Sequence, residues 1–154
     1  MRELPGAGLR MDVSILENIK DKFGLADIDA NGYSPLTLAF IGDSVFDLVV
    51  KTVVVERANR SANILHRKTS RIVRAQSQAQ MVKWFIEKGI LSDEELAIYK
   101  RGRNAKSPTT AKNASVGDYR KATGLEALIG YLYLKNRTSR IVELIKTGME
   151  LTDE

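Results

Sequence analysis

Two segments of the chain are much more apolar than the rest, and both have the composition of buried helices. The first covers residues 36–55 and the second, LEALIGYLYL, covers residues 125–134. Ser34 can cap a helix and Pro35 suits the first helical position, so we expect the first segment to be a helix that ends near Val55. Its many valines would also suit strands, and the hydrophobic period alone leaves that choice open.

Shorter helical patterns fill much of the remaining chain. Ser61 can cap a short helix that runs through His66. A second helix is expected to stop at Gly89, because apolar residues precede it at spacings of three and four. These residues are Ile72, Ala75, Ala79, Val82 and Ile86. A capping box at Ser92 predicts a third helix that ends near Tyr99.

The pattern as a whole predicts an all-α fold with one long loop. Residues 101–117, RGRNAKSPTTAKNASVG, have the composition of a loop. A loop of this length in a compact domain is more often functional than idle. We expect residues 1–30 to form an N-terminal extension with a first helix, and residues 31–150 to form a single domain.

Each apolar segment contains an acid near a glycine. Asp43 lies in the first segment and Glu126 in the second, with Gly130 four residues later on the same helical face. An unpaired buried carboxylate is costly, so Asp43 needs a partner. Glycine inside a helix usually permits another helix to come close. The two helices could cross with the acids facing each other, and such a pair would repel unless a cation lay between them.

The simpler interpretation is that Asp43 and Glu126 accept unrelated hydrogen bonds.

The composition of the chain narrows the class of protein to which it can belong. The chain has 154 residues, of which 44% are hydrophobic and 28% charged, as expected of one globular domain. It has no cysteine, which excludes disulfides and Cys-ligated zinc and suits a cytoplasmic protein. The N-terminus lacks an apolar signal core, so we expect no secretion. Acids and a lysine inside residues 36–55 argue against a membrane span, at ~3 kcal/mol each near a bilayer centre.

The net charge of +5 is concentrated in two places. Residues 57–74 contain six Lys or Arg and no acid, and residues 100–121 contain seven against Asp118 alone. The rest of the chain has 11 basic and 18 acidic residues. Such a local excess favours a phosphate-binding face, although two solvated basic surfaces would give the same count.

Once other kinds of catalytic site are excluded, catalysis by a hard metal cation remains. The single histidine excludes a two-histidine acid–base nuclease, and a zinc site is disfavoured without cysteine. His66 lies among basic residues with no acid nearby in sequence, which argues against Ser-His-Asp catalysis. Mg²⁺ binds through one or two carboxylates and can activate a water while it contacts a phosphate. A carboxylate pair beside a basic loop therefore indicates metal-assisted phosphodiester hydrolysis.

Two motifs resemble the ribonuclease III family. LAFIGDSVFD, from Leu38, is similar to the family signature, and ATGLEALIGYLYL, from Ala122, is similar to its second motif. KRGRNAKS and DYRKATGLEALIGYLYL further resemble the Mini-III ribonucleases, which consist of the catalytic domain without a double-stranded-RNA-binding domain. The resemblance implies an all-helical, cytoplasmic homodimer that cleaves double-stranded RNA with Mg²⁺ and matures the 23S ribosomal RNA precursor.

The resemblance also assigns residues. Asp43 and Glu126 match two of the four acids that surround the metal in the broader family, and we expect them to bind metal and catalyse cleavage. The other two positions are Ala39 and Thr123, which cannot replace a carboxylate. Asp47 either supports the metal site indirectly or is simply a solvated helix residue. Asp118 either orients Arg120 or begins a helix.

For RNA contacts the sequence offers two basic groups. A-form RNA is bound through phosphates and 2′-hydroxyls across its shallow minor groove, which favours Arg, Lys and Asn side chains. Gly102 would let the loop backbone approach the RNA. The expected loop contacts are Arg101, Arg103, Asn104 and Lys106. A second expected patch consists of His66, Lys68 and Arg71.

Two functions of other classes stay open at this point. In the first, the protein keeps the fold but is inactive because two of the four family acids are missing. It would then be an RNA-binding or ribosome-assembly module that binds RNA without cutting it. In the second, the domain is a helical protein-interaction scaffold whose basic face meets an acidic partner. A ribosomal protein on the substrate is a further possible partner.

Overall fold

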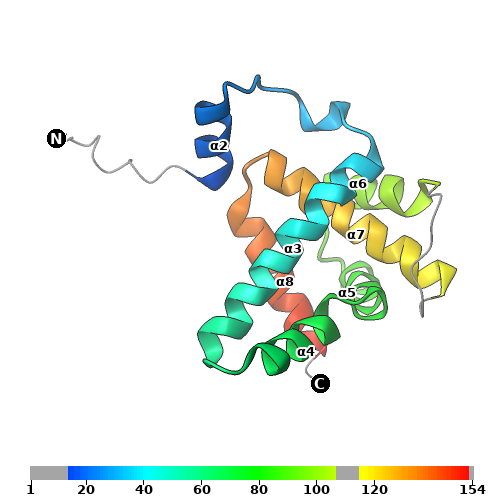
Figure 1. Cartoon of the computed structure of the whole chain (residues 1–154). Helices are drawn as coiled ribbons and strands as arrows, with labels where there is room; N and C mark the ends of the chain where they lie inside the picture. Colours follow the sequence, from blue (N-terminus) through cyan, green and yellow to red (C-terminus); the bar gives the residue numbers. More distant parts are fainter. Residues whose placement is uncertain (1–13, 107–114, 153–154) are drawn as a thin grey trace.

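A computed structural model of the chain describes residues 14–106 and 115–152, and these residues form helices without any strand (Figure 1). This confirms the predicted all-α fold. The elements are α2 (Ile15–Phe23), η1 (Ala30–Gly32), α3 (Pro35–Arg57), α4 (Ala62–Val73), α5 (Ala75–Glu87), α6 (Asp93–Asn104), α7 (Val116–Leu134) and α8 (Thr138–Thr152). No helix in the described part of the chain is long and apolar enough to cross a membrane.

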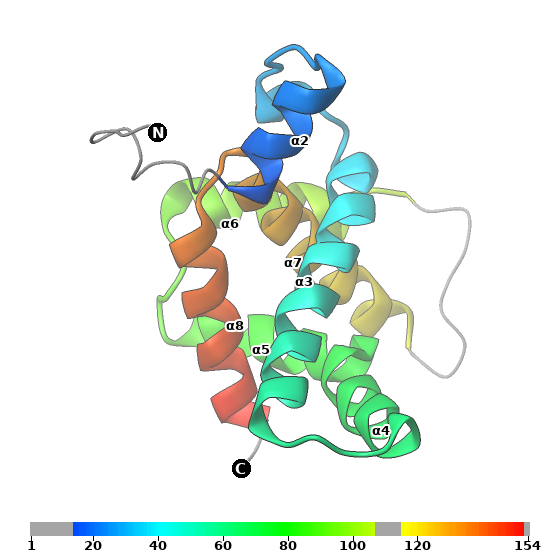
Figure 2. The same cartoon turned by 60° about the vertical axis from the view of Figure 1, so that its left-hand side comes forward.

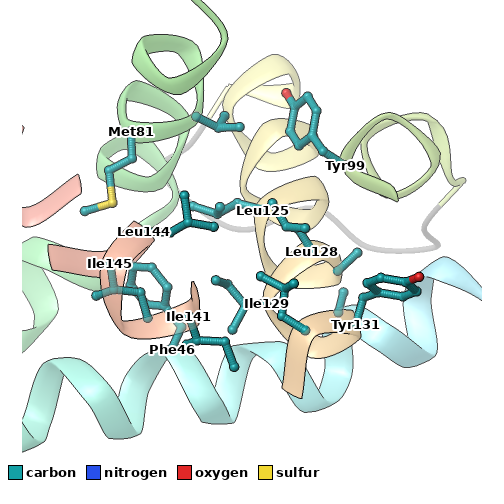
Figure 3. Packing of buried hydrophobic residues seen from close by; sticks show 14 of the residues in the cluster. Phe46, Met81, Tyr99, Leu125, Leu128, Ile129, Tyr131, Ile141, Leu144 and Ile145 are labelled. Atoms are coloured by element: carbon teal, nitrogen blue, oxygen red, sulfur yellow. The ribbon is translucent and has the colours of Figure 1, made fainter. Parts of the chain in front are cut away.

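Helix α7 is the centre of the molecule. It makes its most extensive contacts with α3, α6 and α5, and α3 crosses it on one side (Figures 1 and 2). From Ala122 to Leu132 every residue of α7 except Glu126 is buried. A helix that is apolar all round is typical of a core position. Figure 3 shows Leu125, Leu128 and Ile129 of α7 among side chains of the surrounding helices.

The predicted helix starts are confirmed by their caps. Ser34 accepts a hydrogen bond from the Thr37 backbone N–H, and Pro35 occupies the first helical position of α3. Ser61 caps α4, and Ser92 forms the complete capping box of α6 with Glu95. Each cap satisfies a backbone N–H group that the first turn of a helix leaves without a partner.

The predicted helix ends were less accurate. Helix α4 continues past His66 to Val73, and the chain then breaks at Arg74, which is extended. Ile72 therefore belongs to α4 and not to the helix that stops before Gly89. The spacing of apolar residues continues across the break because α4 and α5 both turn apolar side chains toward the core. The same spacing also misassigned Ile86, which is exposed, while its neighbour Phe85 is buried.

The predicted loop at residues 101–117 is also wrong at both ends. Arg101, Arg103 and Asn104 form the last turn of α6, and α7 already begins at Val116. Residues 107–114 lie outside the described residues. The helix extends because Gly102, which suggested a loop, is buried against α7, where its lack of a side chain is needed. A Cβ on Gly102 would lie 2.7 Å from the Cβ of Ala127.

The crossing of α3 and α7 is a backbone-to-backbone contact. A Cβ added to Gly42 would lie 1.7 Å from the backbone oxygen of Glu126, and one added to Gly130 would lie 2.0 Å from the backbone oxygen of Leu38. The prediction that Gly130 permits a close helix approach is therefore confirmed, and Gly42 is its counterpart on α3. This contact fixes how Asp43, which follows Gly42, faces Glu126, which precedes Gly130 by one helical turn.

Candidate active site

Asp43 and Glu126 meet beside the glycine crossing. Asp43 follows Gly42 on α3, and Glu126 lies one turn before Gly130 on α7. Their side chains lie within hydrogen-bonding distance of each other. The two acids therefore face each other as predicted, and Glu126 also accepts a hydrogen bond from outside the pair, as the simpler interpretation expects.

The expectation that Asp43 is buried is not met within one chain. Its side chain is exposed, whereas Glu126 is half-buried among the apolar residues of α7. Asp43 is exposed because it lies at the edge of the α3 face that packs on α7, where Gly42 and Phe46 make the buried contacts. The pair thus opens to solvent on the Asp43 side, so that a charged ligand can reach it.

The surroundings make Glu126 unusually hard to ionise. Burial raises the pKa of Glu126 to about 8, from an ordinary value of 4.5, and the nearby Asp43 charge adds to the increase. Near neutral pH the neutral Glu126 carboxyl can donate a hydrogen bond to Asp43. A cation between the two side chains would offset the repulsion and favour the ionised form of both.

A third side chain, Gln78, also contacts the pair. Its Nε2 donates to Glu126 Oε2 at 3.2 Å and to the backbone oxygen of Val73 at 2.8 Å. Sequence reasoning missed this residue, because nothing in the stretch AQSQAQ separates Gln78 from the exposed Gln76 and Gln80. Its only signal is the helical spacing that puts it on the buried face of α5 with Met81, Val82 and Phe85.

These residues fit a hard cation. The two carboxylates offer the oxygen ligands that Mg²⁺ prefers. No group of three or more His, Cys, Asp or Glu side chains gathers among the described residues. The donor set therefore suits Mg²⁺ with several waters better than an ion enclosed by protein ligands.

The other acids considered from the sequence do not join the pair. Asp47 forms an ion pair with Lys51 at 2.8 Å along α3, as a solvated helix residue would. Asp118 lies in the first turn of α7, where its backbone N–H is capped by Ser115. At the two positions without acids, Ala39 is buried and Thr123 donates its hydroxyl to the Tyr119 backbone oxygen.

The basic end of α6 packs on the stretch of α7 that contains Glu126. Gly102 packs on Gly124 and Ala127 of α7, on either side of Glu126 along that helix. Arg101 and Asn104 are exposed, and so is Lys106 just beyond the helix. Gly102 faces α7, so the expectation that it brings the backbone to RNA is wrong.

Arg103 is held differently from its neighbours. It is half-buried, with its guanidinium 5.7 Å from the centre of the Tyr99 ring and its Nε donating to Asn104 Oδ1 at 3.1 Å. A cation over an aromatic face at this distance is attracted to the ring. The last turn of α6 therefore presents Arg103 in a restrained position, while Arg101 is exposed.

The second basic patch is only partly assembled. Lys68 and Arg71 line a pocket of about 290 Å³ between α4 and the end of α3. Arg57 and Arg60 line it as well. Both belong to the basic segment 57–74, but they were not among the expected RNA contacts. His66 is exposed but does not line this pocket, because residues two apart on a helix point in opposite directions.

The raised pKa of Glu126 predicts how stability depends on pH. The unfolded chain releases this proton near pH 4.5, while the folded protein keeps it up to about pH 8. Glu126 therefore disfavours folding progressively across that interval and by a constant amount above it. In a chelating buffer, Glu126→Gln should be more stable than the parent by on the order of 2 kcal/mol at about pH 9, and nearly equal to it at about pH 4. Chemical denaturation at both pH values measures this, and an equal difference at both would contradict it.

Comparison with known proteins supplies the family. Residues 36–137 match the Ribonuclease III domain. The chain belongs to the ribonuclease III family. It is 43% identical over 127 residues to Mini-ribonuclease 3 of Clostridium tetani, covering 82% of this chain and 83% of that protein. It is 44% identical to Mini-ribonuclease 3 of Staphylococcus aureus, covering 79% and 90%.

A solved structure agrees with the fold. The crystal structure of a protein from Fusobacterium nucleatum superposes with a TM-score of 0.71 at 30% identity and covers 79% of this chain and 96% of that one. The identity to the Mini-ribonuclease 3 proteins confirms the resemblance seen in the sequence motifs. As a member of this family the chain is an endoribonuclease.

Proposed function

We propose that this endoribonuclease cleaves double-stranded RNA with Mg²⁺, and that Asp43 and Glu126 are its metal-binding and catalytic residues. The observation that supports this most is the pairing of the two carboxyls across the Gly42–Gly130 crossing. Two adjacent acids that destabilise each other are retained at a solvent-open position of an otherwise apolar contact. Such an arrangement is better explained by a cationic ligand than by stability.

The chain's own contribution is to hold the two carboxylates in place. The backbone contact of α3 with α7 sets their separation. Burial raises the pKa of Glu126, so a bound cation would be needed to favour its ionised form near neutral pH. When bound, Mg²⁺ would supply a Lewis acid for the phosphate and lower the pKa of a bound water. The basic end of α6, which packs on the stretch of α7 that contains Glu126, would hold the RNA backbone near this pair.

The direct test is cleavage of a plain RNA duplex by the purified protein. With Mg²⁺ we expect the duplex to be cut, and with a chelator we expect RNA binding without cutting. Binding without cleavage at any Mg²⁺ concentration would instead support the inactive RNA-binding module. Absence of both would support the protein-interaction scaffold.

For RNA binding we propose Arg101, Arg103, Asn104 and Lys106, with His66, Lys68 and Arg71 as a second patch. The support is that both groups are basic, and that all of these side chains except the half-buried Arg103 are exposed. The first group also lies at the end of α6 that packs on α7 at Gly124 and Ala127.

Removing two arginines should change the salt dependence of binding. Each Lys or Arg bound to a phosphate displaces counterions, so the RNA binding constant K falls as salt increases. Arg101→Ala with Arg103→Ala should make the plot of log K against log salt less steep, by roughly 2. Binding to all duplex sequences should weaken about equally, and cleavage should recover with excess RNA at low salt. Titrations at several salt concentrations measure the slope.

A charge-matched variant is the control for this experiment. Lys22→Ala with Lys146→Ala removes the same charge from α2 and α8, away from the proposed contacts, and should leave the slope nearly unchanged. If the two double variants behave alike, the end of α6 does not bind the RNA backbone, and the second patch would take its place.

We further propose that the protein acts as a homodimer through the exposed face of α3. Phe40 is 80% exposed and Leu48 is 56% exposed, and with Val55 they lie within an arc of about 80° on the helix. Exposed apolar residues in such a row are typical of a surface that another protein covers. Asp43 lies at the edge of this row, so a two-fold dimer would place two acid pairs near one RNA duplex.

A charge on this face should separate the dimer. We expect the parent to sediment at about twice the mass of one chain, and Leu48→Glu to sediment as a monomer. Ile86→Glu introduces the same charge at an exposed apolar residue of α5 and should remain dimeric. A parent that is monomeric at micromolar concentration would exclude this proposal.

For the natural substrate we propose the 23S ribosomal RNA precursor in the cytoplasm, with a ribosomal protein as a possible guide. The support is the similarity to Mini-ribonuclease 3 proteins and the motifs shared with Mini-III ribonucleases. Precursor ends that mature normally in cells lacking this protein would argue against it.

A further inference from the structure

We propose that Gln78 is a positioning residue that orients the Glu126 carboxylate for the cation. The proposal rests on the function proposed above, because it concerns the same acid pair. It adds a residue that belongs to neither apolar motif and that lies on a third helix, α5. Gln78 acts through Glu126 and is not itself a catalytic residue.

The two hydrogen bonds of the Gln78 amide define its orientation. Nε2 donates to Glu126 Oε2 at 3.2 Å and to the Val73 backbone oxygen at 2.8 Å. A primary amide nitrogen has two hydrogens, and here both go to oxygen acceptors. The reversed amide would place an oxygen against two oxygens, so the contacts themselves distinguish the nitrogen from the oxygen.

The location of Gln78 makes this contact rigid. The side chain is 1% exposed and lies in the first turns of α5, just after the break at Arg74. Val73 is the last residue of α4, so one amide ties the end of α4 and the start of α5 to Glu126 on α7. With one carboxylate oxygen held, rotation about the last bond of the Glu126 side chain is restricted. The other oxygen then has a defined direction.

Stability alone does not explain the amide. Gln78 Oε1 is buried and has no donor in the described part of the chain. A buried acceptor without a donor costs free energy that an apolar side chain of similar size would avoid. The neighbouring Ser77 already joins the two helices, because its hydroxyl donates to the Arg71 backbone oxygen at 2.7 Å. Gln78 differs from Ser77 in that it also contacts Glu126.

The experiment measures cation binding without RNA. Mn²⁺, as a probe for the Mg²⁺ site, is titrated by calorimetry into the parent and into Gln78→Met, which keeps the side-chain length and removes the donor. We expect Gln78→Met to bind Mn²⁺ about tenfold more weakly, as is typical when a partner of a metal ligand is removed. The Mg²⁺ concentration for half-maximal duplex cleavage should rise by a similar factor, with much of the rate restored at saturating Mg²⁺.

Two variants are matched controls. Gln76→Met makes the same substitution at an exposed position of α5. Ser77→Ala removes a hydrogen bond that also joins α4 to α5 but does not involve Glu126. Both should bind Mn²⁺ like the parent. If Ser77→Ala and Gln78→Met weakened Mn²⁺ binding equally, Gln78 would have only a structural role, and the proposal would be overturned. Parent-like Mn²⁺ affinity in Gln78→Met would overturn it as well.

A measurement on the parent protein covers the case in which Gln78→Met does not fold. The chain has three glutamines, Gln76, Gln78 and Gln80, so selective ¹⁵N labelling gives few side-chain amide signals. The protected Gln78 signal should shift when Mg²⁺ is added, while the two exposed ones should not. An unchanged Gln78 signal under saturating Mg²⁺ would overturn the proposal.

The same titrations separate this proposal from the proposed function. If Asp43→Asn loses Mn²⁺ binding while Gln78→Met retains it, the acid pair binds the cation without help from Gln78. If the parent itself binds no Mn²⁺, both proposals fail.

Discussion

Asp43→Asn and Glu126→Gln are each expected to reduce cleavage of duplex RNA by at least about a thousandfold, because several kcal/mol of metal-ion stabilisation would be lost. Each amide has nearly the shape of the acid it replaces, so neither change opens a cavity. The amide oxygen introduced by Glu126→Gln can still accept a hydrogen bond from Gln78. Helix content and RNA affinity should therefore remain close to those of the parent.

A matched substitution lies one turn away on the same helix. Asp47→Asn makes the same chemical change at an acid that pairs with Lys51, and it should retain most of the cleavage rate. Single-turnover cleavage at saturating Mg²⁺, with RNA binding measured in a chelator, separates chemistry from affinity. A cleavage rate near that of the parent in either Asp43→Asn or Glu126→Gln would show that the metal site lies elsewhere.

The acid pair could be predicted from the sequence because its signal is local. A carboxylate inside an apolar helix is unusual, and a glycine within four residues suggests a nearby helix. Asp43 and Glu126 each meet this description, so their meeting required only that the two helices cross. Helix starts were predictable for the same reason, since a cap such as Ser34 acts within its own first turn.

Features that depend on packing were not predictable. Gly102 reads as a loop residue, and only its contact with Ala127 shows why the helix must continue through it. Gln78 lies 48 residues before Glu126 in the chain, and its neighbours Gln76 and Gln80 have the same side chain. Burial and hydrogen bonding single out Gln78, and both follow from tertiary structure rather than from the local sequence.

The same packing explains why the site is sensitive to changes far smaller than the loss of an acid. Gly42→Ala is expected to destabilise the fold by about 3 kcal/mol or more, at the upper end of the usual cost of overpacking. The added Cβ would lie 1.7 Å from the Glu126 backbone oxygen, and a helix backbone cannot rotate away as a flexible side chain can. Helices α3 and α7 must then separate, which also moves Asp43 away from Glu126.

Gly117→Ala provides the control, because Gly117 is also a helical glycine, but among the described residues only the Ser115 hydroxyl oxygen lies near its Cβ position, at 4.0 Å. Because Gly117 is the second residue of α7, the gain in helix propensity should be small, and the variant should be at least as stable as the parent. Chemical denaturation of both variants, with Mn²⁺ binding to whatever folded protein remains, measures the two effects. If Gly42→Ala were as stable as Gly117→Ala and still bound Mn²⁺, the close helix crossing would not be what holds the two acids together.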